Sequence, residues 1–135
     1  MKPISVVAAV IEVDKRILCV QRNQSKYDYI SYKYEFPGGK VEHGESMQDA
    51  LIREIQEELD YEITVSMPIS DFIYDYPDFS VHMHFYHCLA TNQNVTLKEH
   101  IQAQWLERED LSRLDWAAAD LPIVEKLICF KEKVY

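Results

Sequence analysis

Apolar and polar residues alternate or cluster along this chain in a way that predicts a protein rich in β-strands. Apolar and β-branched residues gather in short runs that we interpret as strands: residues 5–13, 16–21, 62–65, 69–76, 80–90 and 104–106. Only Asp14-Lys15 separates the first two runs, and Pro77-Asp78 separates the fourth from the fifth. Each of these two pairs is therefore predicted to form a β-hairpin.

The run at residues 80–90 has the two-residue period of a strand with one buried face, because apolar side chains alternate there with polar ones. His82 and His84 fall on the polar face, two residues apart, so they could share a metal ion. A polar strand face without metal is the interpretation that we favour, since no cysteine lies beside them.

A helix is predicted immediately after the glycines of the first third. An apolar face is marked by residues that recur every four positions: Met47, Leu51, Ile55 and Leu59. Ser46 suits the N-cap position, and Asp49 follows it in capping-box spacing. Gly38-Gly39 precedes this segment and is interpreted as a turn.

A second helix is predicted near the end of the chain, after a helical turn at residues 108–114. Its inner face would be formed by apolar residues: Ile123, Val124, Leu127 and Ile128, with Phe130 extending them. Pro122 suits the first helical turn, and Asp120 stands near the cap position. Residues 23–33 and 91–104 are predicted to be polar loops.

Acidic residues are concentrated around the first predicted helix. Five fall within fourteen residues: Glu45, Asp49, Glu54, Glu57 and Glu58. At roughly 100° per residue, the last three share a sector about 100° wide that overlaps the apolar face. Like charges near an apolar surface need a cation, and a hard divalent ion with oxygen ligands suits them. Arg53 could also hold one carboxylate in a bidentate pair. The alternative is an ordinary acidic helix whose repulsion is tolerated in solvent.

These residues form a pattern, Gly39-x5-Glu45-x7-Arg53-Glu54-Ile55-x-Glu57-Glu58, that resembles the signature of the Nudix hydrolases. The segment Tyr34-Glu35-Phe36-Pro37-Gly38-Gly39-Lys40 extends the resemblance. Over nearly all of residues 4–130 the chain resembles the MutT-like branch, which includes enzymes named CTP pyrophosphohydrolases. It departs at Asp60, where the family motif has a glycine. That glycine resembles a residue that ends a helix in the left-handed backbone conformation. Asp tolerates this conformation better than most residues do.

The resemblance implies an α/β Nudix fold: a mixed β-sheet sandwiched between helices, with a loop-helix-loop catalytic motif, in a single domain over residues 1–135. It implies a Mg²⁺- or Mn²⁺-dependent enzyme that attacks a (deoxy)nucleoside triphosphate at the β-phosphorus and releases NMP and pyrophosphate. CTP, modified dCTP and 8-oxo-dGTP are the substrates it suggests. The alternatives are a Nudix hydrolase of ADP-ribose or a dinucleoside polyphosphate, a non-catalytic nucleotide-binding module, and an interaction protein with an acidic helix.

The same resemblance assigns roles near the metal. The metal ligands would be the Gly38 carbonyl, Glu54, Glu57, Glu58 and Glu99. Either Glu54 or Glu99 would be the general base, Arg53 would orient a carboxylate, and Glu45 would brace the loop and helix. By sequence alone, Lys98-Glu99 is a solvated pair of charges in a loop.

Four residues are assigned to the substrate: Arg22, Glu35, Phe36 and Asp120. Arg22 would contact phosphate or base, or else it is simply solvated. Asp120 either caps the last helix or reads the base, and an acceptor-only carboxylate would favour an exocyclic amine such as cytosine N4. The loop at residues 23–33 is expected to cover the mouth of the site. Its tyrosines or Tyr34 could stack on a base there.

The charge balance limits the partners. Fourteen Lys and Arg against 23 Asp and Glu give a net charge of −9, which disfavours nucleic acids and anionic membranes. A nucleoside triphosphate that arrives with its metal remains compatible. Cys19, Cys88 and Cys129 lack metal-site spacing and are expected to be small buried side chains in a reducing cytosol. Because the sequence shows no signal peptide and no long apolar run, we expect a cytoplasmic protein. We expect it to be a monomer or a homodimer.

Overall fold

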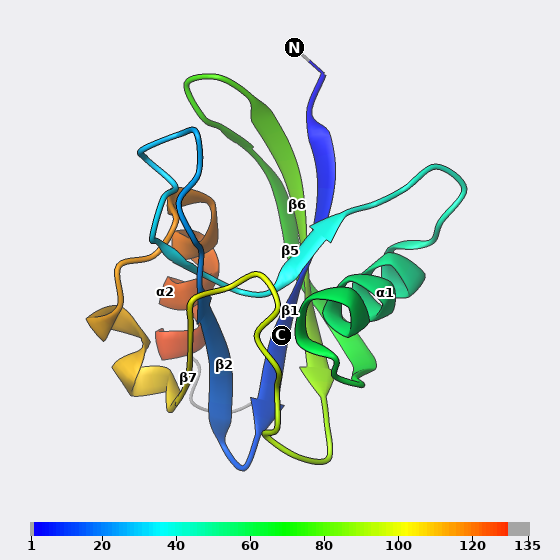
Figure 1. Ribbon diagram of the computed structural model, residues 1–135, viewed down its shortest axis with the longest axis vertical. Coiled ribbons are helices and arrows are strands. Elements are labelled where there is room, and N and C mark those ends of the chain that lie inside the picture. Colours follow the sequence, from blue (N-terminus) through cyan, green and yellow to red (C-terminus); the bar gives the residue numbers. More distant parts are fainter. Residues whose placement is uncertain (1, 130–135) are drawn as a thin grey trace.

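The computed structural model describes residues 2–129 as a mixed β-sheet with helix α1 against one face and helix α2 against the other (Figure 1). The elements follow one another as β1 (Ile4–Val13), β2 (Arg16–Gln21), β3 (Tyr34–Glu35), β4 (Gly38–Lys40), α1 (Met47–Leu59), β5 (Thr64–Asp75), β6 (Ser80–Leu89), β7 (Gln102–Leu106), the 3₁₀ turns η1 (Arg108–Arg113) and η2 (Ala118–Asp120), and α2 (Leu121–Cys129). The predicted fold class is confirmed. Within the described residues no helix is long and apolar enough to cross a membrane.

Strand β1 is the centre of the sheet, whose order is β3-β2-β1-β6-β5 with β4 beside β1 and β7 beside β2. It pairs in parallel with β6 from Ile4 to Glu12, whereas its pairings with β2 and β4 are antiparallel. Asp14 and Lys15 have φ angles of 52° and 64°, as a tight two-residue hairpin turn requires. The first predicted hairpin is therefore confirmed.

The side chains of β1 enter two apolar cores, because successive residues of a strand point to opposite faces. Val7, Ala9 and Ile11 pack in the core that α1 covers. Ala8 and Val10 pack in the core that α2 covers. A strand buried on both faces is apolar throughout, which explains why this run does not alternate with polar residues.

Strand β5 differs from the prediction. Residues 62–65 and 69–76 were expected to be separate strands, but β5 is continuous from Thr64 to Asp75 and is paired with β6. Irregularities in the register fall between Val65 and Met67 and between Pro68 and Ser70. The strand lies at the edge of the sheet, where bulges and a proline are tolerated.

Two other expectations were wrong. Gly38 and Gly39 do not form a turn, because they lie in β4 and pair with Ala8 and Val7 of β1. Cys129 is exposed, whereas Cys19 and Cys88 are free and buried as expected. The position of Phe130 lies outside the described residues.

Candidate active site

Helix α1 is held at both ends by local interactions. The Ser46 hydroxyl accepts a hydrogen bond from the Asp49 backbone N–H at 3.1 Å, so the predicted cap is confirmed. Asp60 has φ 48° and ψ 54°, and its N–H reaches the Gln56 carbonyl. This left-handed conformation is the one expected for the position where the motif has glycine. The apolar face of α1 packs on the sheet, so the acidic sector of the helix is turned toward β4. This apolar face consists of Ala50, Leu51, Ile55 and Leu59.

Arg53 donates hydrogen bonds to three carboxylates at the surface of this helix. Its guanidinium contacts Glu45 through two nitrogens at 2.7 and 3.0 Å, Glu54 at 2.9 Å and Glu57 at 3.1 Å. It also donates to the Lys40 carbonyl at 3.1 Å, which ties α1 to β4. The hydrogen bond to Glu45 is the main cause of the raised pKa of Arg53. Arg53 therefore stays charged and fixes how Glu45, Glu54 and Glu57 are oriented.

The two glycines of β4 allow close packing at the same place. A Cβ on Gly39 would overlap the Glu54 carboxylate, and a Cβ on Gly38 would overlap the Val7 carbonyl of β1. Glycine is required where a backbone approaches another group this closely. The glycines therefore bring the backbone of β4 against both the central strand and an acid of α1.

Glu58 is a buried carboxyl with one oxygen that makes no hydrogen bond to the described residues. It is 7% exposed, and its Oε1 atom has no hydrogen-bond partner among the described residues. Burial raises the pKa of Glu58 to about 9, and the negative charges of Glu35, Glu54 and Glu99 add to the rise. Burial also raises the pKa of Glu54, against the opposing effect of Arg53. Such a group is stable as a carboxylate only beside a cation, so these residues suit a divalent metal.

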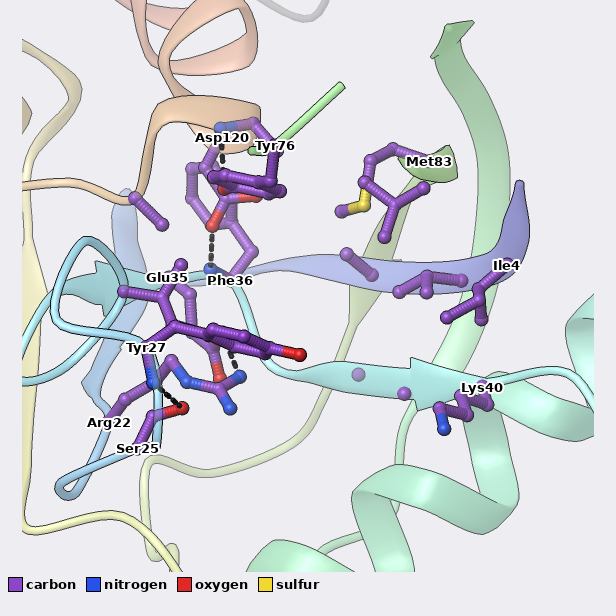
Figure 2. Close-up of a pocket in the computed structure, with 18 of the residues that line it drawn as sticks. Ile4, Arg22, Ser25, Tyr27, Glu35, Phe36, Lys40, Tyr76, Met83 and Asp120 are labelled. Carbon is purple, nitrogen blue, oxygen red and sulfur yellow. Dashed lines mark hydrogen bonds and ion pairs between the residues drawn. The ribbon is translucent and has the colours of Figure 1, made fainter. Parts of the chain in front are cut away.

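A cavity of about 660 Å³ is lined by Glu58 of α1 and by residues of the core that α2 covers, among them Phe36 and Met83. Figure 2 shows Phe36 and Met83 on its wall. Most of the residues predicted to bind the metal or the substrate line this cavity. They are Gly38, Glu58, Glu99, Arg22, Glu35, Phe36 and Asp120. Arg53 and Glu57 do not line it; the Glu57 side chain is 59% exposed. Glu54 also lies outside the lining, behind Gly39. The sequence-predicted site is thus divided between the cavity and the adjoining surface of α1.

Asp120 lies at the end of the cavity near α2. It is 3% exposed, and its carboxyl accepts a hydrogen bond from the Phe36 backbone N–H at 3.2 Å (Figure 2). Burial raises the pKa of Asp120 well above its usual value, and the charge of Glu35 adds to this. The carboxyl therefore faces the cavity and not the start of α2, so the capping interpretation was wrong. A protonated carboxyl is both a donor and an acceptor, which revises the acceptor-only expectation.

Glu35 links the two ends of the cavity. Its carboxylate contacts Arg22 at 3.1 Å and His100 Nε2 at 3.0 Å, and its charge acts on both Glu58 and Asp120. Arg22 is therefore paired and not freely solvated. His100 was missed by sequence reasoning, although it follows Glu99 directly; its Nδ1 is buried without a partner among the described residues.

The loop at residues 23–33 is attached to the β5–β6 hairpin by stacked aromatic rings. Tyr29 stacks on Tyr76 at 5.5 Å and donates a hydrogen bond to Asp78 at 2.7 Å. Tyr27 contacts Phe79 at 5.3 Å and lines the cavity. Tyr34 belongs to the buried core. Of the four tyrosines considered for stacking, Tyr27 is the one that lines the cavity.

Comparison with known proteins gives consistent results. The family model described as "NUDIX domain" matches residues 1–127. A CTP pyrophosphohydrolase of Escherichia coli K12 is 35% identical over 131 residues, which cover 97% of this chain and 96% of that protein. An 8-oxo-dGTP diphosphatase of the same organism is 26% identical over 94% of this chain and 98% of its own length. The solution structure of the E. coli ORF135 protein matches 96% of this chain and 91% of its own, with 35% identity and a TM-score of 0.80.

Proposed function

This chain belongs to the Nudix hydrolase family, and from that premise we propose that it is a Mg²⁺- or Mn²⁺-dependent nucleoside triphosphate pyrophosphohydrolase. Water attacks the β-phosphorus of the nucleotide, the bond to the α-phosphate oxygen breaks, and the products are NMP and pyrophosphate. The observation that carries the proposal is the buried Glu58 carboxyl beside Glu35, Glu54 and Glu99 at the end of an open cavity. A pure binding protein has no need to bury a carboxyl whose pKa is raised so far.

The cation would be held by Glu54, Glu57, Glu58, Glu99 and the Gly38 carbonyl. When bound, it supplies positive charge for the phosphates and lowers the pKa of water. Arg53 holds Glu45, Glu54 and Glu57 in place, so these carboxylates need little reorganisation when substrate enters. Either Glu54 or Glu99 accepts the proton of the attacking water. Glu54 is fixed by Arg53, whereas Glu99 is exposed at the cavity rim, and both are close enough to Glu58 to raise its pKa.

The far end of the cavity would receive the base. Phe36 and Asp120 line that end, and Arg22 lies between them and the carboxylates, held by Glu35. A protonated Asp120 would donate to one ring nitrogen and accept from a neighbouring amine, an order that the N3 and N4 edge of cytosine offers. This pairing is compatible with CTP or a modified dCTP as substrate, which the similarity to the CTP pyrophosphohydrolase supports. The oxidised purine 8-oxo-dGTP is the second candidate, favoured by the similarity to the 8-oxo-dGTP diphosphatase.

The decisive measurement is pyrophosphate release at saturating Mg²⁺ and in EDTA. The panel consists of CTP, dCTP, 5-methyl-dCTP, 8-oxo-dGTP, dATP, ADP-ribose and NADH, ranked by kcat/KM. We expect turnover of a nucleoside triphosphate that EDTA abolishes. Glu58→Gln should lower kcat by about 10²–10³-fold, because a neutral amide is a weaker ligand for the cation that neutralises the reacting phosphate.

Glu125→Gln is the matched control, since Glu125 is an exposed glutamate of α2. It should leave kcat unchanged. Full turnover by both Glu57→Gln and Glu58→Gln would overturn the assignment of the carboxylates. Turnover confined to ADP-ribose or NADH would replace the proposed substrate class, and Mg²⁺ uptake without any turnover would indicate a nucleotide-binding module.

A further inference from the structure

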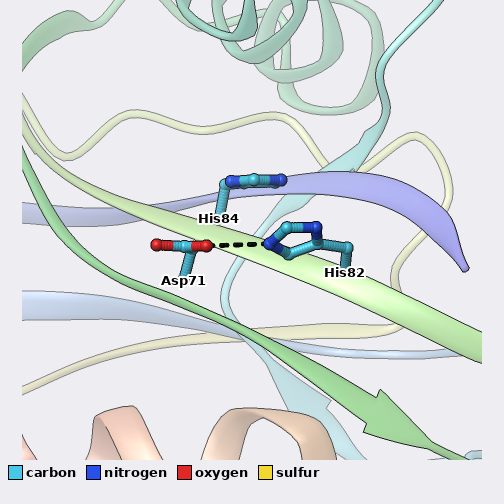
Figure 3. Close-up of side chains that lie close together, drawn as sticks. All are labelled: Asp71, His82 and His84. Carbon is cyan, nitrogen blue, oxygen red and sulfur yellow. Dashed lines mark hydrogen bonds and ion pairs between the residues drawn. The ribbon is translucent and has the colours of Figure 1, made fainter.

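Two histidines and an aspartate meet on the outer part of the β5–β6 pair (Figure 3). His82 and His84 project from β6 on the same side, and Asp71 of β5 lies directly opposite His84 in the strand register. The Asp71 carboxylate is 2.8 Å from His82 Nε2, and the two imidazole rings are stacked with centroids 4.1 Å apart. One potential ligand atom from each residue lies within 4.8 Å of the other two.

This cluster lies on the opposite face of the sheet from the nucleotide cavity. Val81 and Met83 alternate with the two histidines along β6, and both line the cavity. Because neighbouring residues of a strand point to opposite faces, the two histidines lie on the side of β6 away from Val81 and Met83, on the face of the sheet that α1 covers. Solvent reaches the cluster, since the side chains of Asp71 and His82 are 62% and 36% exposed. An ion can therefore enter without passing through the cavity.

We propose that Asp71, His82 and His84 form a second metal site, which binds a transition-metal dication of the Zn²⁺ class. Two imidazole nitrogens and one carboxylate oxygen suit Zn²⁺, Ni²⁺ or Cu²⁺, whereas Mg²⁺ prefers oxygen ligands alone. Three protein ligands leave a further position for water. The ion replaces the hydrogen bond between Asp71 and His82 and links the edge strand to its neighbour. The paired strands hold the three residues together before the ion arrives, which lowers the entropic cost of binding.

The test is calorimetric titration of the full chain with ZnCl₂ in a large excess of Mg²⁺, which occupies the oxygen-rich site. We expect the wild-type protein to bind one Zn²⁺ through the cluster. The double variant His82→Asn/His84→Asn should lose this binding, and Asp71→Asn should weaken it by about 10–100-fold. Zn²⁺ should raise the melting temperature of the wild-type protein but not that of the double variant.

Two controls separate this site from other Zn²⁺ ligands. His43 is an exposed histidine in another loop, and Cys129 is an exposed thiol, so His43→Asn and Cys129→Ser should both bind Zn²⁺ like wild type. The double histidine variant should also keep wild-type pyrophosphate release with Mg²⁺, because the cluster lies outside the cavity. Equal Zn²⁺ binding by the wild type and the double variant, or no binding by either, would overturn the proposal and leave the cluster as a surface hydrogen-bond network.

Discussion

At the scale of single residues, the site is defined by two buried carboxyls with different surroundings. Glu58 has an oxygen without a partner among the described residues, whereas Asp120 accepts a hydrogen bond from the Phe36 backbone. Burial raises the pKa of both. The first therefore suits a cation, and the second suits a neutral hydrogen-bonding partner such as a base.

We predict that Asp120→Ala lowers kcat/KM for CTP by about 10–100-fold and removes the preference for CTP over UTP, because alanine can neither donate to nor accept from the edge of the base. Asp120→Asn should be intermediate, since the amide also carries a donor and an acceptor but differs in its geometry. The measurement is kcat/KM for both nucleotides. Asp115→Ala is the control, because Asp115 is an exposed residue paired with Lys33 at 2.8 Å. An unchanged CTP preference in Asp120→Ala would exclude Asp120 from base recognition.

At the scale of elements, helix α1 is a unit that its own sequence specifies. The Ser46 cap begins it, the left-handed Asp60 ends it, and its apolar face docks on the sheet. The two caps connect residues within a few positions of one another. The docking on the sheet and the Arg53 contact to the Lys40 carbonyl connect α1 to distant segments, and together they orient Glu54, Glu57 and Glu58. The capping energy contributes to stability rather than to the reaction.

Ser46→Ala should therefore lower the free energy of unfolding by about 1 kcal/mol, because the Asp49 N–H loses its acceptor. Urea unfolding measures this change, and kcat at saturating Mg²⁺ should stay near the wild-type value. Ser66 is an exposed serine of β5, and Ser66→Ala is expected to change stability by less than about 0.5 kcal/mol. Equal effects from both substitutions would refute the role of the cap.

At the scale of the whole molecule, a buried ionic group ties three elements together at the end of the central strand. Glu12 of β1 contacts His87 of β6 at 3.0 Å and Arg108 of η1 at 2.9 Å. Burial alone would raise the pKa of Glu12, but the hydrogen bonds from His87 and Arg108 and the charge of Arg108 lower it to about 2. The group therefore connects the sheet to the segment that leads into α2.

This depressed pKa predicts acid sensitivity. Below an unfolded-state pKa of 4.5, the unfolded chain takes up a proton that folded Glu12 does not. The stabilisation is thus complete above that pH and is lost as the pH falls toward about 2, with a contribution of about 2 kcal/mol. Urea unfolding from neutral to acidic pH should show wild type and Glu12→Gln converging as the pH falls. A difference that stays constant with pH would contradict this explanation.

Local patterns predicted several elements correctly. The β1–β2 hairpin and α1 follow from short-range spacing and turn residues, and the Nudix pattern pointed to the acids around α1. The prediction failed where pairing is long-range. Local rules predict a turn at Gly38 and Gly39. They form β4 instead because their backbone pairs with β1, and a Cβ on Gly38 would collide with that strand. Residues 62–65 and 69–76 are one strand because β6 pairs with both across two irregularities.

By itself, the sequence determined the family, the acidic helix and its caps, because each depends on residue types at fixed short spacings. Only the tertiary structure decided that Glu58 is buried near Glu35, that His100 pairs with Glu35, and that Asp120 faces the cavity. It also brought Asp71 to His82 and His84. Burial and proximity of this kind depend on how distant segments pack and in which register their strands pair, and no local pattern contains that information.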